Sequence, residues 1–385
     1  MVVSSLLSDP VHLVGLGVAA AELVYMGLAL WAVARFRERP RHLPEKPRPI
    51  SVLVPIYGAP PGLEDCLRSI CDQQYPRYQV IFGLHRDDDP AKAMIERLIA
   101  ERPGADLTLI VDETMIGANP KNCNLANMYP AARYEIIAMI DSDVRVRPDF
   151  LSTIVGELDD PAVGGVTCLY KGAAIGGLAS RLGALAITDW FIPSVLVHLL
   201  LREVDRCYGA AIVVTRRALE DVGGFHAMAS AVAQDYVFGV ELRRAGYRLR
   251  LAPYVVETTV VEPSLKHLFY HERRWNRALR AYQPVDHALS IITHALPITA
   301  LLLTLPTPTS LGYGLLTALL SLRVSLHFLV RTRIPIADGA VPWLVPLREC
   351  LSFAVWASSF ATKRLCWGQR TLTVTGSLTM AARHE

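Results

Sequence analysis

The chain has 385 residues, of which 52% are hydrophobic and only 19% are charged, with a mean hydropathy of +0.29 and a net charge of +3. This balance is too apolar for an ordinary soluble protein and too charged for a pure bundle of membrane helices, so it favours a soluble domain joined to membrane helices. No acidic or basic tract indicates nucleic-acid binding, and the seven cysteines form no Cys-x-x-Cys pair that would suggest a zinc site.

The N-terminal region predicts a membrane anchor over residues 1–35. Its apolar segment, residues 11–34, carries one interior charge, Glu22. About 20 apolar residues span a bilayer core, and this segment is too long for a signal-peptide core. A basic, proline-rich linker follows over residues 36–49, and the positive-inside rule places it in the cytoplasm. We expect Glu22 to pair within the membrane bundle, because an unpaired charge is costly in lipid.

From residue 50 the pattern changes to strands that alternate with helices. Strands are predicted at residues 50–56, 79–84, 106–111 and 136–140, with helices at 62–73, 91–99 and 121–131 between them. This alternation predicts a parallel, doubly wound sheet. Further on, strands are predicted at residues 165–170, 211–214 and 248–251, and a helix at 234–245.

Two other parts of the chain are rich in apolar residues. Residues 172–200 are interrupted by charges, so we interpret them as helices packed under the active site or lying at the membrane interface, with a buried core helix as the alternative. Residues 288–305 and 311–330 are membrane-like runs, and the short run at 350–362 favours an interfacial or re-entrant helix. The predicted organisation is therefore a cytoplasmic α/β domain over residues 50–285 and C-terminal membrane helices over 286–385.

Two carboxylates, Asp141 and Asp143, follow the buried strand at 136–140. Ligands of open α/β sheets bind just beyond the carboxyl ends of the strands. Carboxylate oxygens there suit a hard divalent cation, which in turn can hold a diphosphate. An Asp-x-Asp pattern alone is common, and a capped, solvated turn is the alternative.

Several short motifs agree in their order along the chain. They are residues 117–125, 141–143, 166–172, 234–236, 263–265, 274–275 and 346–356. With them the chain resembles the GT-A glycosyltransferases of the large family 2 group, and most closely the ceramide glucosyltransferase and hopanoid-biosynthesis-associated branch. The resemblance covers roughly residues 11–370 and implies a GT-A type doubly wound mixed sheet, with membrane helices at both ends.

The resemblance implies an inverting, metal-dependent transfer of a hexose or N-acetylhexosamine from a UDP-sugar to a hydroxyl of a membrane lipid. The lipid would be a hopanoid polyol or a ceramide. A Mg²⁺ or Mn²⁺ ion held by Asp143, with Asp141 assisting or contacting the nucleotide, would neutralise the leaving diphosphate. Asp235 would act as the general base toward the acceptor hydroxyl. The alternative for Asp235 is a carboxylate that only caps its helix.

Arg274 and Trp275 resemble the family's (Gln/Arg)-x-x-Arg-Trp element, in which Arg binds phosphate and Trp lines the sugar site. Its first position is His271 in this chain, a departure from the pattern. The alternative is a basic helix on anionic lipid headgroups, which Arg273, Arg277 and Arg280 fit better than they fit catalysis.

The uridine-contacting acid is expected to be Asp87, with Asp88 as the alternative, because the family's usual position holds Arg86. Lys121 either meets a phosphate or faces solvent.

Two other functions stay open. A processive polysaccharide synthase uses the same chemistry, but the three or four expected spans are few for a channel. A catalytically inactive membrane scaffold would be expected to lack Asp-x-Asp or the base, and both are present. The expected location is the bacterial inner membrane, crossed several times, with the catalytic domain in the cytoplasm.

Overall fold

The computed structural model describes residues 10–39, 46–304, 308–336, 339–361, 364–367, 370–374 and 380–382. Residues 1–9 of the predicted anchor and 40–45 of the predicted linker lie outside these ranges. The chain forms two compact units. The helical unit comprises Met1–Arg37, Gly176–Leu201 and Glu262–Leu365, and the sheet unit comprises Glu38–Ile175, Arg202–Val261 and Cys366–Glu385.

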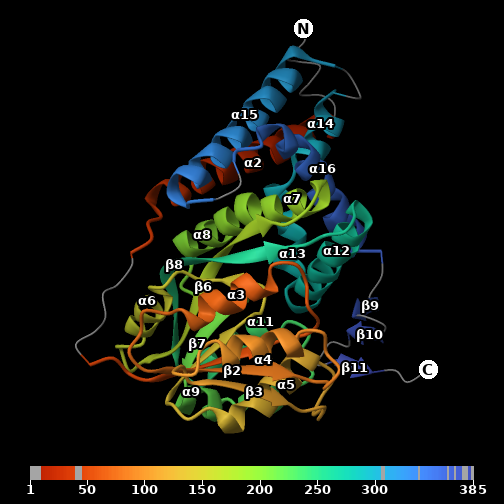
Figure 1. The fold of residues 1–385 in the computed structure, drawn as a ribbon. Coiled ribbons are helices and arrows are strands. Elements are labelled where there is room, and N and C mark those ends of the chain that lie inside the picture. Colours follow the sequence, from red (N-terminus) through yellow and green to blue (C-terminus); the bar gives the residue numbers. More distant parts are fainter. Residues whose placement is uncertain are drawn as a thin grey trace. The chain divides into compact units, whose positions relative to one another are not determined.

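The sheet unit is built on eight strands in the order β3-β2-β1-β4-β7-β6-β8-β5. Strands β2, β3, β6, β7 and β8 are labelled in Figure 1. The strands are β1 (Ile50–Pro55), β2 (Tyr78–Leu84), β3 (Leu107–Val111), β4 (Ile136–Ile140), β5 (Val144–Arg145), β6 (Val163–Ala174), β7 (Ala211–Thr215) and β8 (Arg248–Val260). Strands β1 to β4 run parallel, and β7 is antiparallel to both β4 and β6. The sheet is therefore doubly wound and mixed, as the resemblance implies.

The helices of the sheet unit follow the predicted alternation. They are α3 (Leu63–Cys71), α4 (Lys92–Ala100), α5 (Pro120–Met128), α6 (Phe150–Gly156), α9 (Arg216–Asp221), α10 (Gly224–Ala227) and α11 (Gln234–Arg244), with a short 3₁₀ turn η1 (Tyr129–Ala131) after α5. Every residue of β4 is buried, which explains its unbroken apolar run, since a parallel strand covered on both faces has no polar side.

Strands β6 and β8 are longer than predicted, at 12 and 13 residues. The prediction for β8 stopped before Pro253, because proline cannot donate to a strand ladder. In the structure β8 continues past it with a change of register: Leu251 pairs with Thr167, and Val255 with Leu169. A bulge in the ladder therefore accommodates the proline.

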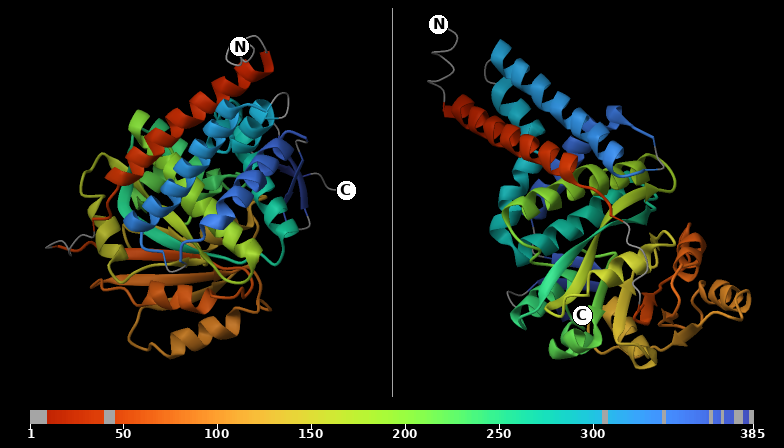
Figure 2. Two further views of the ribbon diagram at one scale, coloured as in Figure 1. Left: turned by 90° about the horizontal axis from the view of Figure 1, so that it is seen from above. Right: turned by 90° about the vertical axis from the view of Figure 1, so that its left-hand side faces the viewer.

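The helical unit is made of α2 (Pro10–Arg35), α7 (Leu178–Leu185), the π-helix η2 (Ala186–Phe191), α8 (Ile192–Leu201), α12 (Leu265–Tyr282), α13 (Pro284–Leu289), η3 (Ser290–Thr293), α14 (Leu296–Thr304), α15 (Ser310–Arg333), η4 (Pro342–Leu344) and α16 (Val345–Ser359). Helices α2 and α15 lie side by side (Figures 1 and 2). A separate small sheet has the order β11-β10-β9, with β9 (Arg364–Trp367), β10 (Arg370–Val374) and β11 (Met380–Ala382).

In the part of the chain that the structure describes, three helices are long and apolar enough to cross a membrane: α2, the continuous helix Leu178–Leu201, and α15. The pair Pro284–Thr293 and Leu296–Thr304, bent by 66°, adds a fourth if it forms one broken span. These apolar helices suggest membrane association. Whether α16 lies on or enters a membrane stays a prediction.

The helix Leu178–Leu201 differs from the interrupted pattern expected for residues 172–200. Its charge at Asp189 is buried, and it is matched by neighbours: Arg331 donates to one carboxylate oxygen at 2.9 Å and His327 Nδ1 lies 2.5 Å from the other. Pairing lowers the free-energy cost of burying the charge of Asp189, and such charges were the reason not to predict a membrane span over these residues. Residues 176–201 and 262–285 group with the helical unit, so the compact units cut across the predicted boundary at residue 285.

Buried ion pairs join the helices of this unit. Arg323 of α15 pairs with Glu349 of α16 at 2.6 Å and lies 3.9 Å from Glu22 of α2. Arg348 of α16 makes two parallel hydrogen bonds of 2.7 Å to Glu272 of α12. The expectation that Glu22 pairs within the bundle is confirmed.

Candidate active site

The Asp-x-Asp motif lies where β4 ends. The backbone N–H of Asp141 donates to Ala210 O at 2.8 Å, and Asp143 O accepts from the N–H of Thr259, in β8, at 2.8 Å. These bonds tie the motif to the segment before β7 and to the far end of β8. Both carboxylates are half-buried. The turn that carries the motif is therefore tied by backbone hydrogen bonds to two other segments of the sheet unit.

Lys121, the second residue of α5, places its ammonium on this motif, 2.5 Å from Asp141 Oδ1. Helix α5 begins here because Asn119 caps it, its side chain accepting from the N–H of Asn122, and Pro120 occupies the first helical position. The Lys121 side chain is 29% exposed, so it pairs with Asp141 and still reaches solvent. It forms the positive centre of the acid cluster.

Asp235 is the second residue of α11. The cap position is Ala233, which makes no side-chain cap bond, so Asp235 is not the N-cap and that alternative is wrong. Asp235 Oδ2 lies so close to Gly209 that a Cβ placed on this glycine would be 2.5 Å from it. A side chain at this position would displace the carboxylate of Asp235.

The turn Gly209-Ala210 brings Asp235 and Asp141 together. Gly209 contacts the carboxylate of Asp235, and the carbonyl of Ala210 receives the N–H of Asp141. Ala210 has φ of +74°, and among the described residues no other non-glycine has a positive φ. Backbone strain of this kind costs about 1–3 kcal/mol and collects at functional sites. Both acids are therefore in contact with this one turn.

The start of α5 is docked on the segment that leads to α11. The N–H of Asn119 donates to Ala229 O at 2.8 Å, and its side-chain amide donates to Ala231 O at 2.8 Å. The amide of Asn122 donates to Met228 O. Both asparagines are buried. These bonds set the position of Lys121 relative to the helix that carries Asp235.

The electrostatics follow from packing three carboxylates around one ammonium. Burial raises the pKa of Asp143 from 3.8 to about 7, the charge of Asp141 adds to the rise, and Lys121 opposes it. Burial also raises the pKa of Asp235, again opposed by Lys121. Burial alone would lower the pKa of Lys121, but Asp141, Asp235 and Asp143 together raise it above its usual range.

Tyr170, in β6, is a member of this site that the sequence analysis missed. Burial raises the pKa of its hydroxyl, and the charges of Asp235, Asp141 and Asp143 raise it further. A tyrosine whose pKa is raised by three neighbouring carboxylates keeps its hydroxyl proton and can donate a hydrogen bond. It lies within the matching stretch 166–172, which was the available signal.

The carboxylates of Asp141 and Asp143 are of the type that a divalent cation prefers. When all three acids are ionised, three carboxylates and one ammonium leave a surplus of two negative charges. Within the described residues, no group of three or more His, Cys, Asp or Glu side chains is arranged to hold a metal ion. Mg²⁺ is commonly held by one or two carboxylates together with substrate phosphates and water. Asp143 and Asp141 would supply the protein ligands, and a diphosphate the rest.

We expect Asp143→Asn to stabilise the cation-free protein at pH 8, on the order of 2 kcal/mol. A folded-state pKa of about 7 against 3.8 means that the folded protein loses stability as pH rises from about 4 to 7, because the buried carboxyl must ionise. Thermal unfolding in detergent with EDTA, at pH 8 and pH 5, measures the difference, which should shrink at pH 5. If Asp143→Asn changed the free energy of unfolding by the same amount at pH 8 and pH 5, the burial assigned to Asp143 would be wrong.

The two candidates for the uridine contact are both exposed and paired with neighbours. Asp87 pairs with Lys92 at the start of α4, and Asp88 pairs with Arg86 at 2.6 Å. Asp89 instead accepts the N–H of Gly58 at 2.9 Å. The role of Asp87 stays a prediction.

The basic-aromatic element lies on α12, in the helical unit. His271 Nδ1 is 2.6 Å from Glu262 Oε1, and its ring centroid is 4.3 Å from that of Trp275. Burial lowers the pKa of Arg274, with the charge of Glu262 opposing the change. The meeting of this element with the acid cluster at one sugar stays a prediction. Arg277 is buried, which does not fit a headgroup contact.

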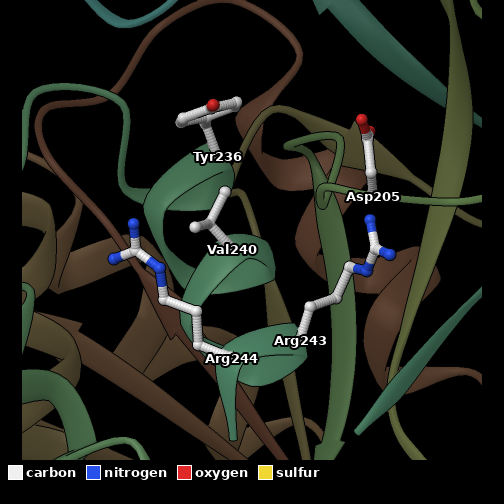
Figure 3. Close-up of a pocket in the computed structure, with 5 residues that line it drawn as sticks. All are labelled: Asp205, Tyr236, Val240, Arg243 and Arg244. Carbon is white, nitrogen blue, oxygen red and sulfur yellow. The ribbon is translucent and has the colours of Figure 1, made fainter. Parts of the chain in front are cut away.

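A shallow pocket of about 310 Å³ lies along the outer side of α11 (Figure 3). Tyr236, Val240, Arg243 and Arg244 line it from the helix, and Asp205 lines it from the preceding loop. None of the three clustered acids contributes to this lining, so the pocket is separate from the acid cluster.

Comparison with known proteins finds a glycosyl transferase family and several ceramide glucosyltransferases. The model of glycosyl transferase family 21 matches residues 14–378. Ceramide glucosyltransferase 1 of Caenorhabditis elegans is 23% identical over 268 residues, which cover 69% of this chain and 57% of that protein. The ceramide glucosyltransferase of Komagataella phaffii is 34% identical over 121 residues, covering 30% of this chain and 24% of that protein. The chain thus spans less than two thirds of these relatives.

Among solved structures, the mannosyltransferase PcManGT from Pyrobaculum calidifontis, in complex with GDP-Man and Mn²⁺, superposes with a TM-score of 0.53. It is 19% identical, and the match covers 91% of this chain and 97% of that one. The likeness shows the fold, which is of the GT-A type. The predicted ceramide glucosyltransferase branch agrees with the family and relatives found.

Proposed function

The chain belongs to glycosyl transferase family 21, and from that premise we propose that it transfers a hexose or N-acetylhexosamine from a UDP-sugar to a hydroxyl of a membrane lipid. The observation that carries the proposal is the convergence of Asp141 and Asp235 on the strained Gly209-Ala210 turn. The relatives' names point to ceramide as the acceptor. A hopanoid polyol is the alternative acceptor.

In the proposed reaction Asp235 accepts the proton of the lipid hydroxyl. The hydroxyl oxygen forms a bond to the anomeric carbon from the face opposite the diphosphate, the bond from that carbon to the diphosphate breaks, and the configuration inverts. A raised pKa suits this role, because a base works best when its pKa is near the working pH. Lys121 limits the rise and keeps the carboxylate available.

Asp143 and Asp141 would hold Mg²⁺ or Mn²⁺ against the leaving diphosphate. The ion would supply neutralisation of the charge that builds there. Support comes from the surplus of two negative charges in the cluster and from Mn²⁺ in the mannosyltransferase of the same fold. Arg274, Trp275 and His271 are proposed to complete the donor site, Lys121 to meet its diphosphate, and Asp87 to contact its uridine.

The proposed membrane arrangement is a multi-pass protein with the catalytic domain in the cytoplasm. An N-terminal anchor over residues 1–35, a linker over 36–49, a GT-A domain over 50–285 and membrane helices over 286–385 would hold the acceptor face near the bilayer. The basic residues that follow α2 support this orientation. The bacterial inner membrane is the proposed location and goes with the hopanoid alternative.

The test is a transfer assay on the purified full chain in lipid-supplemented detergent. UDP-glucose and UDP-N-acetylglucosamine, each labelled in the sugar, are offered with ceramide or with a hopanoid polyol, and the labelled lipid is identified by mass. We expect one glycolipid product that requires Mg²⁺ or Mn²⁺ and disappears with EDTA. A ladder of polymer lengths would instead support a polysaccharide synthase. Absence of UDP-sugar binding and transfer under all conditions would reject the proposal.

A further inference from the structure

Glu262 is a buried carboxylate at the entry to α12, and no motif of the sequence singled it out as a site residue. It stands before Pro263 and before Ser264, which caps the helix by accepting the N–H of His267. Its side chain is 7% exposed, and its backbone N–H donates to Ser180 Oγ at 2.9 Å. The backbone of Glu262 is therefore fixed next to the start of α12 and to α7.

This carboxylate faces the basic-aromatic element. Glu262 Oε1 lies 2.6 Å from His271 Nδ1, and the His271 ring is tilted by 53° against Trp275 at 4.3 Å. Its charge also acts on the half-buried guanidinium of Arg274. One acid thus contacts the first residue of the element and acts on the charge of Arg274.

The neighbouring acid on α12 has a different partner. Glu272 is buried and bound by two hydrogen bonds of 2.7 Å to Arg348. Glu272 is therefore paired with Arg348 of α16, and Glu262 is the carboxylate that contacts His271.

The contact determines which nitrogen of His271 carries a proton. An ionised carboxylate only accepts hydrogen bonds, so Nδ1 must be the donor. The other nitrogen, Nε2, is then directed away from Glu262. An imidazole donates from both nitrogens only as the imidazolium, so a phosphate oxygen at Nε2 together with Glu262 at Nδ1 requires that form. A charged ring donates from Nε2 as the family's Gln or Arg side chain would.

We propose that Glu262 is a positioning residue of the donor site, which orients His271 so that Nε2–H donates to a diphosphate oxygen of the nucleotide sugar. This inference rests on the proposed function. It also accounts for the departure at His271. A histidine at this position needs a neighbouring carboxylate to orient its ring and to favour the charged form, and Glu262 is that carboxylate.

The test is a double-mutant cycle on the full chain. Glu262→Gln should raise the KM for the UDP-sugar by at least about tenfold with little change in kcat, because a charge-assisted hydrogen bond is lost. In a His271→Arg background, which needs no carboxylate to be charged, the same change should alter KM less than about twofold. Glu262→Asp should restore part of the affinity. Asp286→Asn, an exposed acid on α13, is the matched control and should change nothing.

UDP affinity by titration calorimetry and Trp275 fluorescence on UDP addition give readouts that do not depend on turnover. An equal loss from Glu262→Gln in both backgrounds would mean a structural role and overturn the inference. If Glu262→Gln does not fold, the cycle uses Glu262→Asp and His271→Gln instead. Additive effects of these two changes on KM would also overturn the inference. A parent protein that binds no UDP would reject the proposed function, whereas UDP binding without coupling would reject this inference alone.

Discussion

Asp235→Asn is expected to lower the rate of lipid glycosylation by about 10²–10⁴-fold while leaving UDP binding nearly unchanged. The amide keeps the size of the side chain, so its fit against Gly209 is preserved, but it cannot accept the acceptor's proton. Removing the negative charge also relieves the repulsion from Asp141 that contributes to the raised pKa of Asp235. Folding should therefore be unaffected or improved. Initial rates of glycolipid formation and UDP titration measure the two effects separately.

The matched control is Asp65→Asn, an exposed acid on α3 in the same unit. It should keep the parental rate. If Asp235→Asn transferred sugar at the parental rate, the base assignment would fail, and the inactive-scaffold reading would gain weight. A loss of UDP binding equal to the loss of rate would instead place Asp235 at the donor.

Arg323→Met is expected to destabilise the helical unit by about 3–5 kcal/mol, a large share of the stability of most domains. Arg323 is 2% exposed, and it is the partner of Glu349, which is completely buried, and lies near Glu22. Removing the guanidinium leaves two carboxylates without their cation in an apolar surrounding. Thermal unfolding in detergent should show a large fall in midpoint, or the variant should fail to accumulate in membranes.

The triple change Glu22→Gln, Arg323→Met and Glu349→Gln separates charge from packing. It removes the network as a whole, so it should recover most of the lost stability, since uncharged residues of similar volume often replace buried ion pairs at little cost. Arg181→Met, at an exposed arginine of α7, is the control and should be neutral. If the triple variant were as unstable as Arg323→Met, packing rather than charge would be responsible.

Much of the fold follows from local pattern. The buried run at 136–140 predicted β4, and the carboxylates after it were expected at the ligand edge of a sheet. The helix that carries Asp235 and the pairing of Glu22 were also predicted from charge and periodicity. These features are readable because burial and helix or strand period act over a few neighbouring residues.

Other features were not readable for equally physical reasons. Strand β8 runs on through Pro253 because a bulge in its partner ladder absorbs the break. The helix Leu178–Leu201 is continuous because distant groups, Arg331 and His327, match its charge at Asp189. A sequence shows the proline and the charge, but not the partner that compensates for each.

The sequence by itself determined the alternation of strands and helices, the apolar terminal helices, and the types of residue available for sugar-transfer chemistry. Only the tertiary structure decided how these residues combine. It joined Lys121 to Asp141, placed Asp235 against Gly209, and gave His271 a carboxylate partner in Glu262. Such pairings depend on which chain segments pack together and on the burial that follows, and burial is what converts ordinary aspartates into groups with shifted pKa values.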